Sequence, residues 1–105
     1  MGEIAVFAKL TARPGGRAEL LDALGPLIRS AMEDEPGTEV YAVHLDTEND
    51  DAVWFYEIFT NQAALDAHAA NETRMQDVGA QVQELLAGAI ELSWGRVHLL
   101  KGASQ

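Results

Sequence analysis

The segment at residues 53–59, Val-Trp-Phe-Tyr-Glu-Ile-Phe, constrains the fold of this chain more than any other. Side chains alternate between the two faces of a strand, and here both faces carry large apolar groups. A strand that is apolar on both faces has to be covered on both faces. Helices of the same chain can cover one face, and we expect a second copy of the chain to cover the other.

Four segments have the alternation and the β-forming residues of strands. They are residues 3–12, 39–46, 52–59 and 89–100. The polar run at residues 47–51 is expected to join the second and third strands as a hairpin turn. Gly95, inside the last strand, predicts a bulge or a bend there.

Two helical regions separate these strands. Residues 16–33 carry an apolar stripe with spacings of three and four, formed by Leu21, Leu24, Ile28 and Met32. Pro26 is expected to kink or divide this helix, because proline lacks a backbone donor. Thr60 or Asn61 can cap the second region, which we expect to be divided in two around Asn71.

The resulting order, β-α-β-β-α-β, predicts an α+β domain of the ferredoxin-like kind. Its four-stranded antiparallel sheet would carry helices on one face only. We expect this domain to occupy residues 1–101 and to be followed by a flexible tail at residues 102–105.

The charge of the chain excludes several classes of partner. It has 105 residues, with 17 acidic and 7 basic side chains and a net charge of −10. This balance argues against nucleic-acid and membrane partners, whose phosphates it would repel. Cysteine is absent, so disulfides and thiolate metal sites are excluded. No apolar run approaches the ~20 residues that span a bilayer, and the start of the chain does not resemble a secretory signal. We therefore expect a cytoplasmic protein.

Glu57 and His68 form the most informative pair of polar residues. Burial in an apolar strand disfavours a charged Glu57, which must find a partner or bind a proton. His68 lies on the same helical face as Leu65, and the helix should pack on the strand that contains Glu57. The pair is interpreted either as a general base near neutral pH or as a structural hydrogen bond between helix and sheet. His44 and His98 are too scattered to form a metal site with His68, and no metal is expected.

Phe55, Glu57 and Phe59 share one face of their strand. The aromatic residues either fill the core and an interface or line an apolar pocket for an aromatic ligand. The chain has neither a glycine-rich phosphate loop nor a G-x-S-x-G motif, so hydride transfer, phosphoryl transfer and serine hydrolysis lose support.

Three motifs together resemble the antibiotic biosynthesis monooxygenase family. Residues 35–41, Glu-Pro-Gly-Thr-Glu-Val-Tyr, resemble its E-P-G-x-x-x-Y segment at the start of the second strand. Glu57, followed by Ala-Leu-Asp-Ala-His at residues 64–68, resembles its E…A-L-x-x-H signature. The first strand ends in Arg-Pro-Gly at residues 13–15, which fits the family's P-G turn. The similarity extends from about residue 4 to residue 86.

The resemblance implies a dimeric α+β barrel, in which two ferredoxin-like sheets pack face to face. It also implies a cofactor-free monooxygenase for a quinol-like or polycyclic aromatic phenol, in which the substrate anion passes an electron to O₂. The expected partners are therefore a second copy of the chain, a small aromatic substrate and O₂, without a cofactor. Glu57 and His68 are the candidate catalytic residues. The candidate substrate-binding residues are Phe7, Phe55, Phe59, Tyr41 and Asn71.

Two departures from the family pattern bear on function. Family members often have tryptophan where this chain has Phe59, so an indole donor is missing. The haem-degrading branch of the superfamily uses an asparagine on the first strand, where this chain has Ala8, which argues against haem degradation. Because the family includes members without demonstrated activity, a non-catalytic module that binds an aromatic ligand is the main alternative.

Overall fold

The sheet of this protein is built around two inner strands. The computed structural model describes residues 3–101, in which β1 (Ile4–Thr11) and β3 (Ala52–Phe59) pair with one another. β2 (Thr38–Leu45) pairs with the other edge of β3, and β4 (Glu91–Arg96) with the other edge of β1. All three pairings are antiparallel and give the strand order β2-β3-β1-β4.

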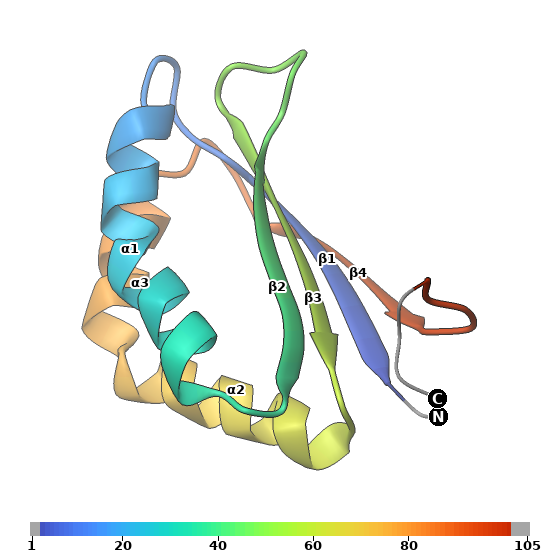
Figure 1. Cartoon of the computed structure of the whole chain (residues 1–105). Helices are drawn as coiled ribbons and strands as arrows, with labels where there is room; N and C mark the ends of the chain where they lie inside the picture. The colour runs from blue at the N-terminus through green and yellow to red at the C-terminus, as the bar shows by residue number, and fades with distance from the viewer. Residues whose placement is uncertain (1–2, 102–105) are drawn as a thin grey trace.

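The helices form a second layer on one face of this sheet (Figure 1). They are α1 (Arg17–Asp34), α2 (Gln62–Arg74) and α3 (Gln76–Glu84). The expected α+β, ferredoxin-like fold is therefore confirmed, with the second helical region divided in two as predicted. The expected tail at residues 102–105 lies outside the described residues.

Strand register decides which side chains meet the helices. Tyr41 pairs with Glu57, and Val6 pairs with the same residue from the other side, so these three side chains share a face. Phe55 and Phe59 lie on that face with them, at alternate positions of β3. Both phenylalanines are buried, which places the core between β3 and the helices.

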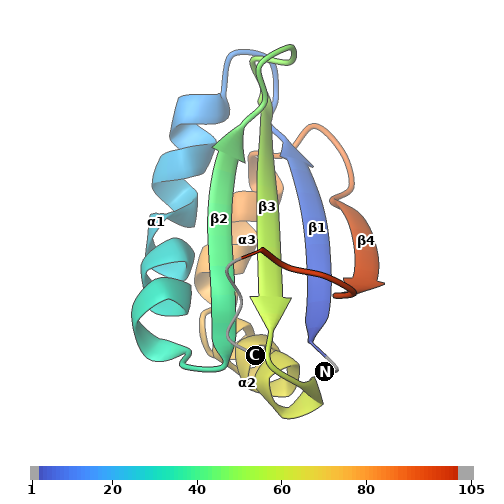
Figure 2. The same cartoon turned by 45° about the vertical axis from the view of Figure 1, so that its right-hand side comes forward.

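The opposite face of the sheet carries no helix in the described part of the chain. Phe7 pairs with Tyr56 and Lys9 pairs with Trp54 on this face, which we call the open face. Phe7 and Trp54 are exposed. Figure 2 shows the segment that follows β4 crossing in front of β1 and β3 on this side.

The break between the last two helices lies later than predicted. α2 continues through Asn71 to Arg74, and the break comes at Met75. Asn71 does not disrupt the helix, because its side chain binds Glu35 and Ser30 and does not compete for the backbone.

Pro26 and Gly95 do not interrupt the elements in which they lie. Pro26 lies inside one continuous helix, α1, and does not divide it. Buried Leu20, Leu24 and Ala31 anchor that helix on both sides of the proline. Gly95 pairs regularly with Ala5, so the sheet has no bulge there, and the irregularity lies between residues 38 and 40 of β2.

A close approach at Gly37 brings the end of α1 next to α2. A Cβ atom at Gly37 would lie 2.5 Å from the Cβ of Ala64, which is too close for any larger residue without a shift. Glycine is required because only a bare backbone fits against the helix. The residues on either side of Gly37 are thereby held beside α2.

Candidate active site

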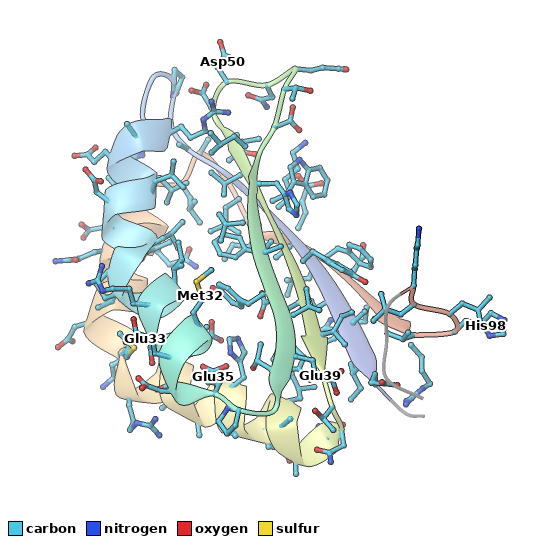
Figure 3. All side chains as sticks on the ribbon, in the orientation of Figure 1. Met32, Glu33, Glu35, Glu39, Asp50 and His98 are labelled. Carbon is cyan, nitrogen blue, oxygen red and sulfur yellow. The ribbon has the colours of Figure 1, made fainter. Side chains whose placement is uncertain are left out.

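Three elements bring their polar side chains to one place between the layers. Glu57 projects from the middle of β3, and His68 lies on the face of α2 that covers this strand. Glu35 is the residue at the C-terminal end of α1, and Figure 3 shows it between α1, α2 and the sheet. The predicted meeting of Glu57 and His68 is confirmed, with 3.4 Å between Glu57 Oε1 and His68 Nε2.

The imidazole of His68 contacts carboxylates on both of its nitrogens. Nδ1 lies 2.8 Å from Oε1 of Glu35, and Nε2 lies 3.4 Å from Oε2 of Glu72. The His68 ring also packs on Phe59, with 5.0 Å between ring centroids. The side chains of His68, Glu35 and Glu57 are 11%, 6% and 9% exposed, whereas Glu72 is 55% exposed. The site therefore has one solvent-facing carboxylate and a buried core.

Glu35 is held by further hydrogen bonds. Thr38 Oγ1 donates to its Oε1 at 2.8 Å, and Asn71 Nδ2 donates to its Oε2 at 2.7 Å. Asn71 in turn accepts a hydrogen bond of 2.7 Å from Arg74. The Glu35 carboxylate is thus fixed in position before any ligand binds.

The surrounding carboxylates favour the charged form of His68. Burial alone would lower the pKa of His68. The hydrogen bonds to Glu72 and Glu35 and the charges of Glu72 and Glu57 outweigh burial and raise the pKa to about 9. His68 therefore rests as an imidazolium at neutral pH.

Glu57 is shifted towards its protonated form. Burial raises its pKa to about 7, the His68 charge opposes this, and the charges of Glu72 and Glu35 add to it. The Oε1 atom of Glu57 is buried and has no hydrogen-bond partner. A carboxyl that exchanges its proton near neutral pH is suited to acid–base work.

Two further titratable groups near this pair, Glu35 and Tyr41, keep their ordinary states. Burial would raise the pKa of Glu35, but hydrogen bonds from Asn71, His68 and Thr38 hold it below its usual value. Burial raises the pKa of the Tyr41 phenol, and the charges of Glu57, Glu72 and Glu35 raise it further. Glu35 therefore stays charged and Tyr41 stays a neutral phenol.

A cavity of about 420 Å³ opens between the sheet and the helices beside these groups. This volume lies within the range of small-molecule sites. Its polar lining includes Glu57, His68, Glu72 and Gln83, and aliphatic side chains form most of its wall. The aromatic residues in the wall are Tyr41, Phe55, Phe59 and Trp94.

Five of the seven predicted site residues line this cavity: Tyr41, Phe55, Glu57, Phe59 and His68. Phe7 does not, because it shares the open face with Tyr56, on which it stacks at 4.8 Å between ring centroids. Asn71 lies behind the cavity and binds Glu35. The roles of all seven in catalysis or binding stay predictions.

The sequence alone did not reveal Glu35 and Glu72 as members of this site. One sequence feature did point to Glu35, because it is the first residue of the Glu-Pro-Gly motif on which the family resemblance is based. Glu72 had another, since it lies four residues after His68 and therefore on the same helical face. Neither position by itself shows that both carboxylates point to one imidazole.

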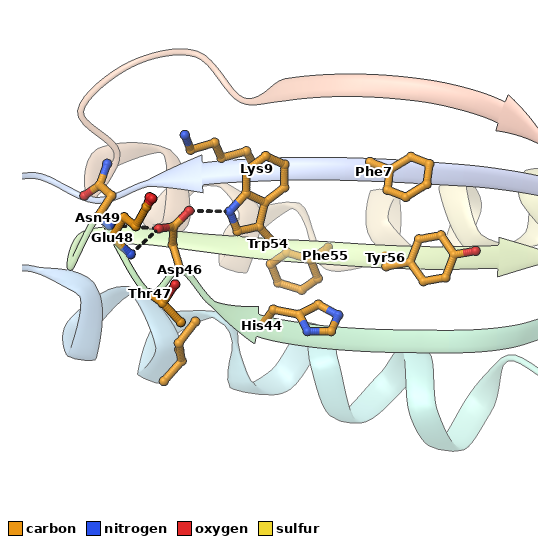
Figure 4. Close-up of a pocket in the computed structure, with 11 residues that line it drawn as sticks. Phe7, Lys9, His44, Asp46, Thr47, Glu48, Asn49, Trp54, Phe55 and Tyr56 are labelled. Carbon is orange, nitrogen blue, oxygen red and sulfur yellow. Dashed lines mark hydrogen bonds between the residues drawn. The ribbon is translucent and has the colours of Figure 1, made fainter.

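The open face carries a broader and shallower depression of about 780 Å³ (Figure 4). Trp54 donates a hydrogen bond of 2.7 Å to Asp46 there, and Lys9 lies over the Trp54 ring. The pKa of Asp46 falls to about 2, chiefly because of this hydrogen bond. The exposed aromatic groups make this surface suited to covering by another protein surface.

Residues 3–101 contain no candidate metal centre and no membrane-spanning helix. No group of three or more His, Asp or Glu side chains is arranged to hold a metal ion. None of the helices in this part of the chain is long and apolar enough to cross a membrane. Figure 3 shows His98 at the far right, away from the helix layer.

The chain is similar to one protein family over most of its length. The family model for antibiotic biosynthesis monooxygenase matches residues 3–88. Among curated proteins, none matches the chain.

Several solved structures share the fold. A Caulobacter crescentus protein, described as a candidate antibiotic biosynthesis monooxygenase, has a TM-score of 0.84 and 23% identity, covering 93% of this chain and 92% of its own. A conserved protein from Methanosarcina mazei has a TM-score of 0.80 and 24% identity, with coverage of 91% and 93%. Rv0793 from Mycobacterium tuberculosis has a TM-score of 0.78 and 25% identity, with coverage of 98% and 100%.

Proposed function

This chain belongs to the antibiotic biosynthesis monooxygenase family, and we propose that it is a cofactor-independent monooxygenase that oxidises a quinol-like or polycyclic aromatic phenol with O₂. The observation that carries the proposal is the unpartnered Oε1 of Glu57, buried beside His68 in a cavity whose mainly apolar wall includes four aromatic residues. A phenol hydroxyl would supply the donor that this oxygen lacks, while its rings pack on the apolar walls.

The proposed reaction begins with a proton transfer. Glu57 accepts a proton from the substrate, and the imidazolium of His68 stabilises the resulting anion. The anion passes one electron to O₂, and the superoxide then bonds to the ring carbon that carries the unpaired electron. When the O–O bond breaks, one oxygen atom stays on the ring as a carbonyl. The other leaves as water, with the proton that Glu57 returns to the peroxide and the hydrogen of the same ring carbon.

Haem degradation has less support from the same cavity. Ala8 of β1 lines it and offers no polar side chain where the haem-degrading branch has an asparagine. The cavity walls provide apolar contacts for flat aromatic rings, which favours a small aromatic phenol.

The proposal includes a second copy of the chain on the open face. Phe7, Trp54 and Tyr56 line the depression on that face, and Phe7 and Trp54 are exposed. Exposed apolar surface of this kind is typical of an interface. A homodimer would bury it and would give the barrel implied by the family.

Replacement of Glu57 tests the proposed reaction. Glu57→Gln keeps the shape of the side chain but removes the proton acceptor, so O₂ uptake should fall by about 10²–10⁴-fold, the usual effect of losing a positioned base. The measurement is an oxygen-electrode trace with an anthrone and a panel of substituted hydroquinones. Glu33→Gln, an exposed change on α1, is the matched control and should retain full uptake.

The same measurement separates the enzyme from a non-catalytic module that binds an aromatic ligand. If these compounds raise the melting temperature of the wild-type protein but none is consumed with O₂, the chain binds aromatic ligands without oxidising them. Unchanged uptake by Glu57→Gln would show that Glu57 is not the acceptor.

A further inference from the structure

The three carboxylates around His68 come from three different elements. Glu35 approaches from the end of α1, Glu57 from β3 and Glu72 from α2. Tyr41, from β2, is the remaining titratable side chain among those that line the cavity. His68 is therefore a single imidazole among three acidic groups.

The contact with Glu35 is the closest and the best protected of the three. It measures 2.8 Å, and the Glu35 side chain is 6% exposed. Glu72 lies at 3.4 Å, and its hydrogen bond and charge also raise the pKa of His68. Its side chain is 55% exposed, however, so water and salt screen this interaction more than that with the buried Glu35. Glu57 lies at 3.4 Å without the geometry of a hydrogen bond, since its Oε1 has no partner.

We propose that Glu35 is a positioning residue, whose carboxylate keeps the His68 imidazole protonated and holds its Nε2 towards the cavity. Glu35 is suited to this role because Thr38 and Asn71 fix both of its oxygens. With Nδ1 bound to Glu35, Nε2 faces Glu57 and Glu72 and is the nitrogen that can meet a ligand. The inference rests on the proposed function for its catalytic meaning.

By keeping His68 protonated, Glu35 sets the separate roles of Glu57 and His68. An imidazolium cannot accept a proton, so the proton goes to Glu57 and His68 holds the substrate anion. The pH profile of kcat/KM should be bell-shaped, rising as Glu57 loses its proton near pH 7 and falling as His68 loses its proton near pH 9.

NMR titration of the histidine ring protons tests the positioning role without any turnover. The resonance of His68 is identified by its loss in His68→Gln. In the wild-type protein it should titrate with a pKa well above the ordinary value of about 6.5. A wild-type His68 that titrates near 6.5 would overturn the inference, whatever the variants do.

Glu35→Gln then removes the charge while keeping an oxygen that can accept from Nδ1. The pKa of His68 should fall by about 1 to 3 pH units, the usual effect of a close opposite charge. The alkaline limb of the pH profile should move by the same amount, while the acid limb, set by Glu57, moves less. Circular dichroism checks that the variant remains folded.

Glu72→Gln is the matched comparison, because it removes a charge from the exposed side of the same imidazole. It should lower the pKa of His68 less than Glu35→Gln does. An equal or larger fall would assign the role to Glu72 and not to Glu35. A raised His68 pKa in a protein that consumes no O₂ would contradict the proposed function and leave the electrostatic role of Glu35 standing.

Discussion

At the scale of single residues, the buried charges of the site lower the stability of the protein at alkaline pH. The pKa of Glu57 rises from 4.5 to about 7 on folding, and that of His68 from 6.5 to about 9. A group with a raised folded pKa binds its proton more tightly in the folded state. Its contribution is fully present below the unfolded pKa and is lost as pH rises through the folded pKa.

Stability should therefore fall as pH rises from about 4.5 to about 9. For Glu57 the fall occupies the window from 4.5 to 7, and for His68 the window from 6.5 to 9. The expected loss of unfolding free energy is on the order of a few kcal/mol. Glu35 has a lowered pKa, so its effect on stability is the opposite. Its contribution to the unfolding free energy is lost as pH falls and its carboxylate becomes protonated.

Urea unfolding at a series of pH values, at fixed protein concentration, measures this dependence. Glu57→Gln cannot titrate and should flatten the profile between pH 4.5 and 7. Glu48→Gln in the hairpin turn should keep the wild-type profile. Parallel curves for the wild type and Glu57→Gln would show that Glu57 has an ordinary pKa in the folded protein.

The residue types in the sequence predicted part of the cluster formed by Glu35, Glu57, His68 and Glu72. A glutamate inside an apolar strand and a histidine on the following helix were sufficient to predict that Glu57 and His68 meet. Glu35 could not be added on the same grounds, because it lies 33 residues before His68 at the end of a helix. Only the tertiary structure, which brings the C-terminal end of α1 to α2, places its oxygen at Nδ1.

At the scale of elements, the start of α2 positions His68. Asn61 is the N-cap residue, with an extended backbone, and its side chain accepts a hydrogen bond of 2.9 Å from the backbone N–H of Ala64. This bond satisfies one of the free donors of the first turn. The prediction that Thr60 or Asn61 caps this helix is confirmed for Asn61.

Asn61→Ala removes this acceptor and should lower the unfolding free energy by about 1 kcal/mol. The control is Asn61→Asp, which keeps an oxygen in the same place and adds a negative charge that the helix N-terminus favours. Urea unfolding compares the three proteins. Equal losses in both variants would mean that the cap contributes nothing and that Asn61 acts through another contact.

The elements also show where local patterns fail. Pro26 was expected to kink or divide α1, and Gly95 to mark a bulge or a bend in β4. The helix is undivided, and the strand pairs regularly at Gly95. The local sequence indicates the free-energy cost of placing proline or glycine inside a helix or strand. The packing of the neighbouring residues decides whether the helix or strand still forms. Buried residues on both sides of Pro26 hold α1 together, whereas no local signal marked the irregularity in β2.

At the scale of the whole molecule, the two faces of the sheet differ in their covering. Helices cover one face, and the other carries the aromatic groups Phe7, Trp54 and Tyr56 (Figures 2 and 4). We expect a second copy to cover this open face.

Trp54→Glu should separate the expected dimer into monomers, because it places a charge at the centre of the interface next to Asp46. Sedimentation velocity at micromolar protein concentration measures the change. Met32→Glu is the control, since Met32 is an exposed apolar residue of α1 in the helix layer. A wild-type protein that sediments as a monomer would contradict the dimer and the interpretation of the open face.

The sequence by itself determined the order of the strands and helices, the class of the fold and the meeting of Glu57 with His68. These follow from alternation, from helical spacing and from the chain order of neighbouring elements, which are local properties. Only the tertiary structure decided which face of each strand meets the helices, and so placed Phe7 on the open face and Asn71 behind the cavity. It also placed Glu35 and Glu72 around one imidazole. The reason is physical: the distance between residues far apart in the chain, and with it the charge that each group carries, depends on how the layers pack.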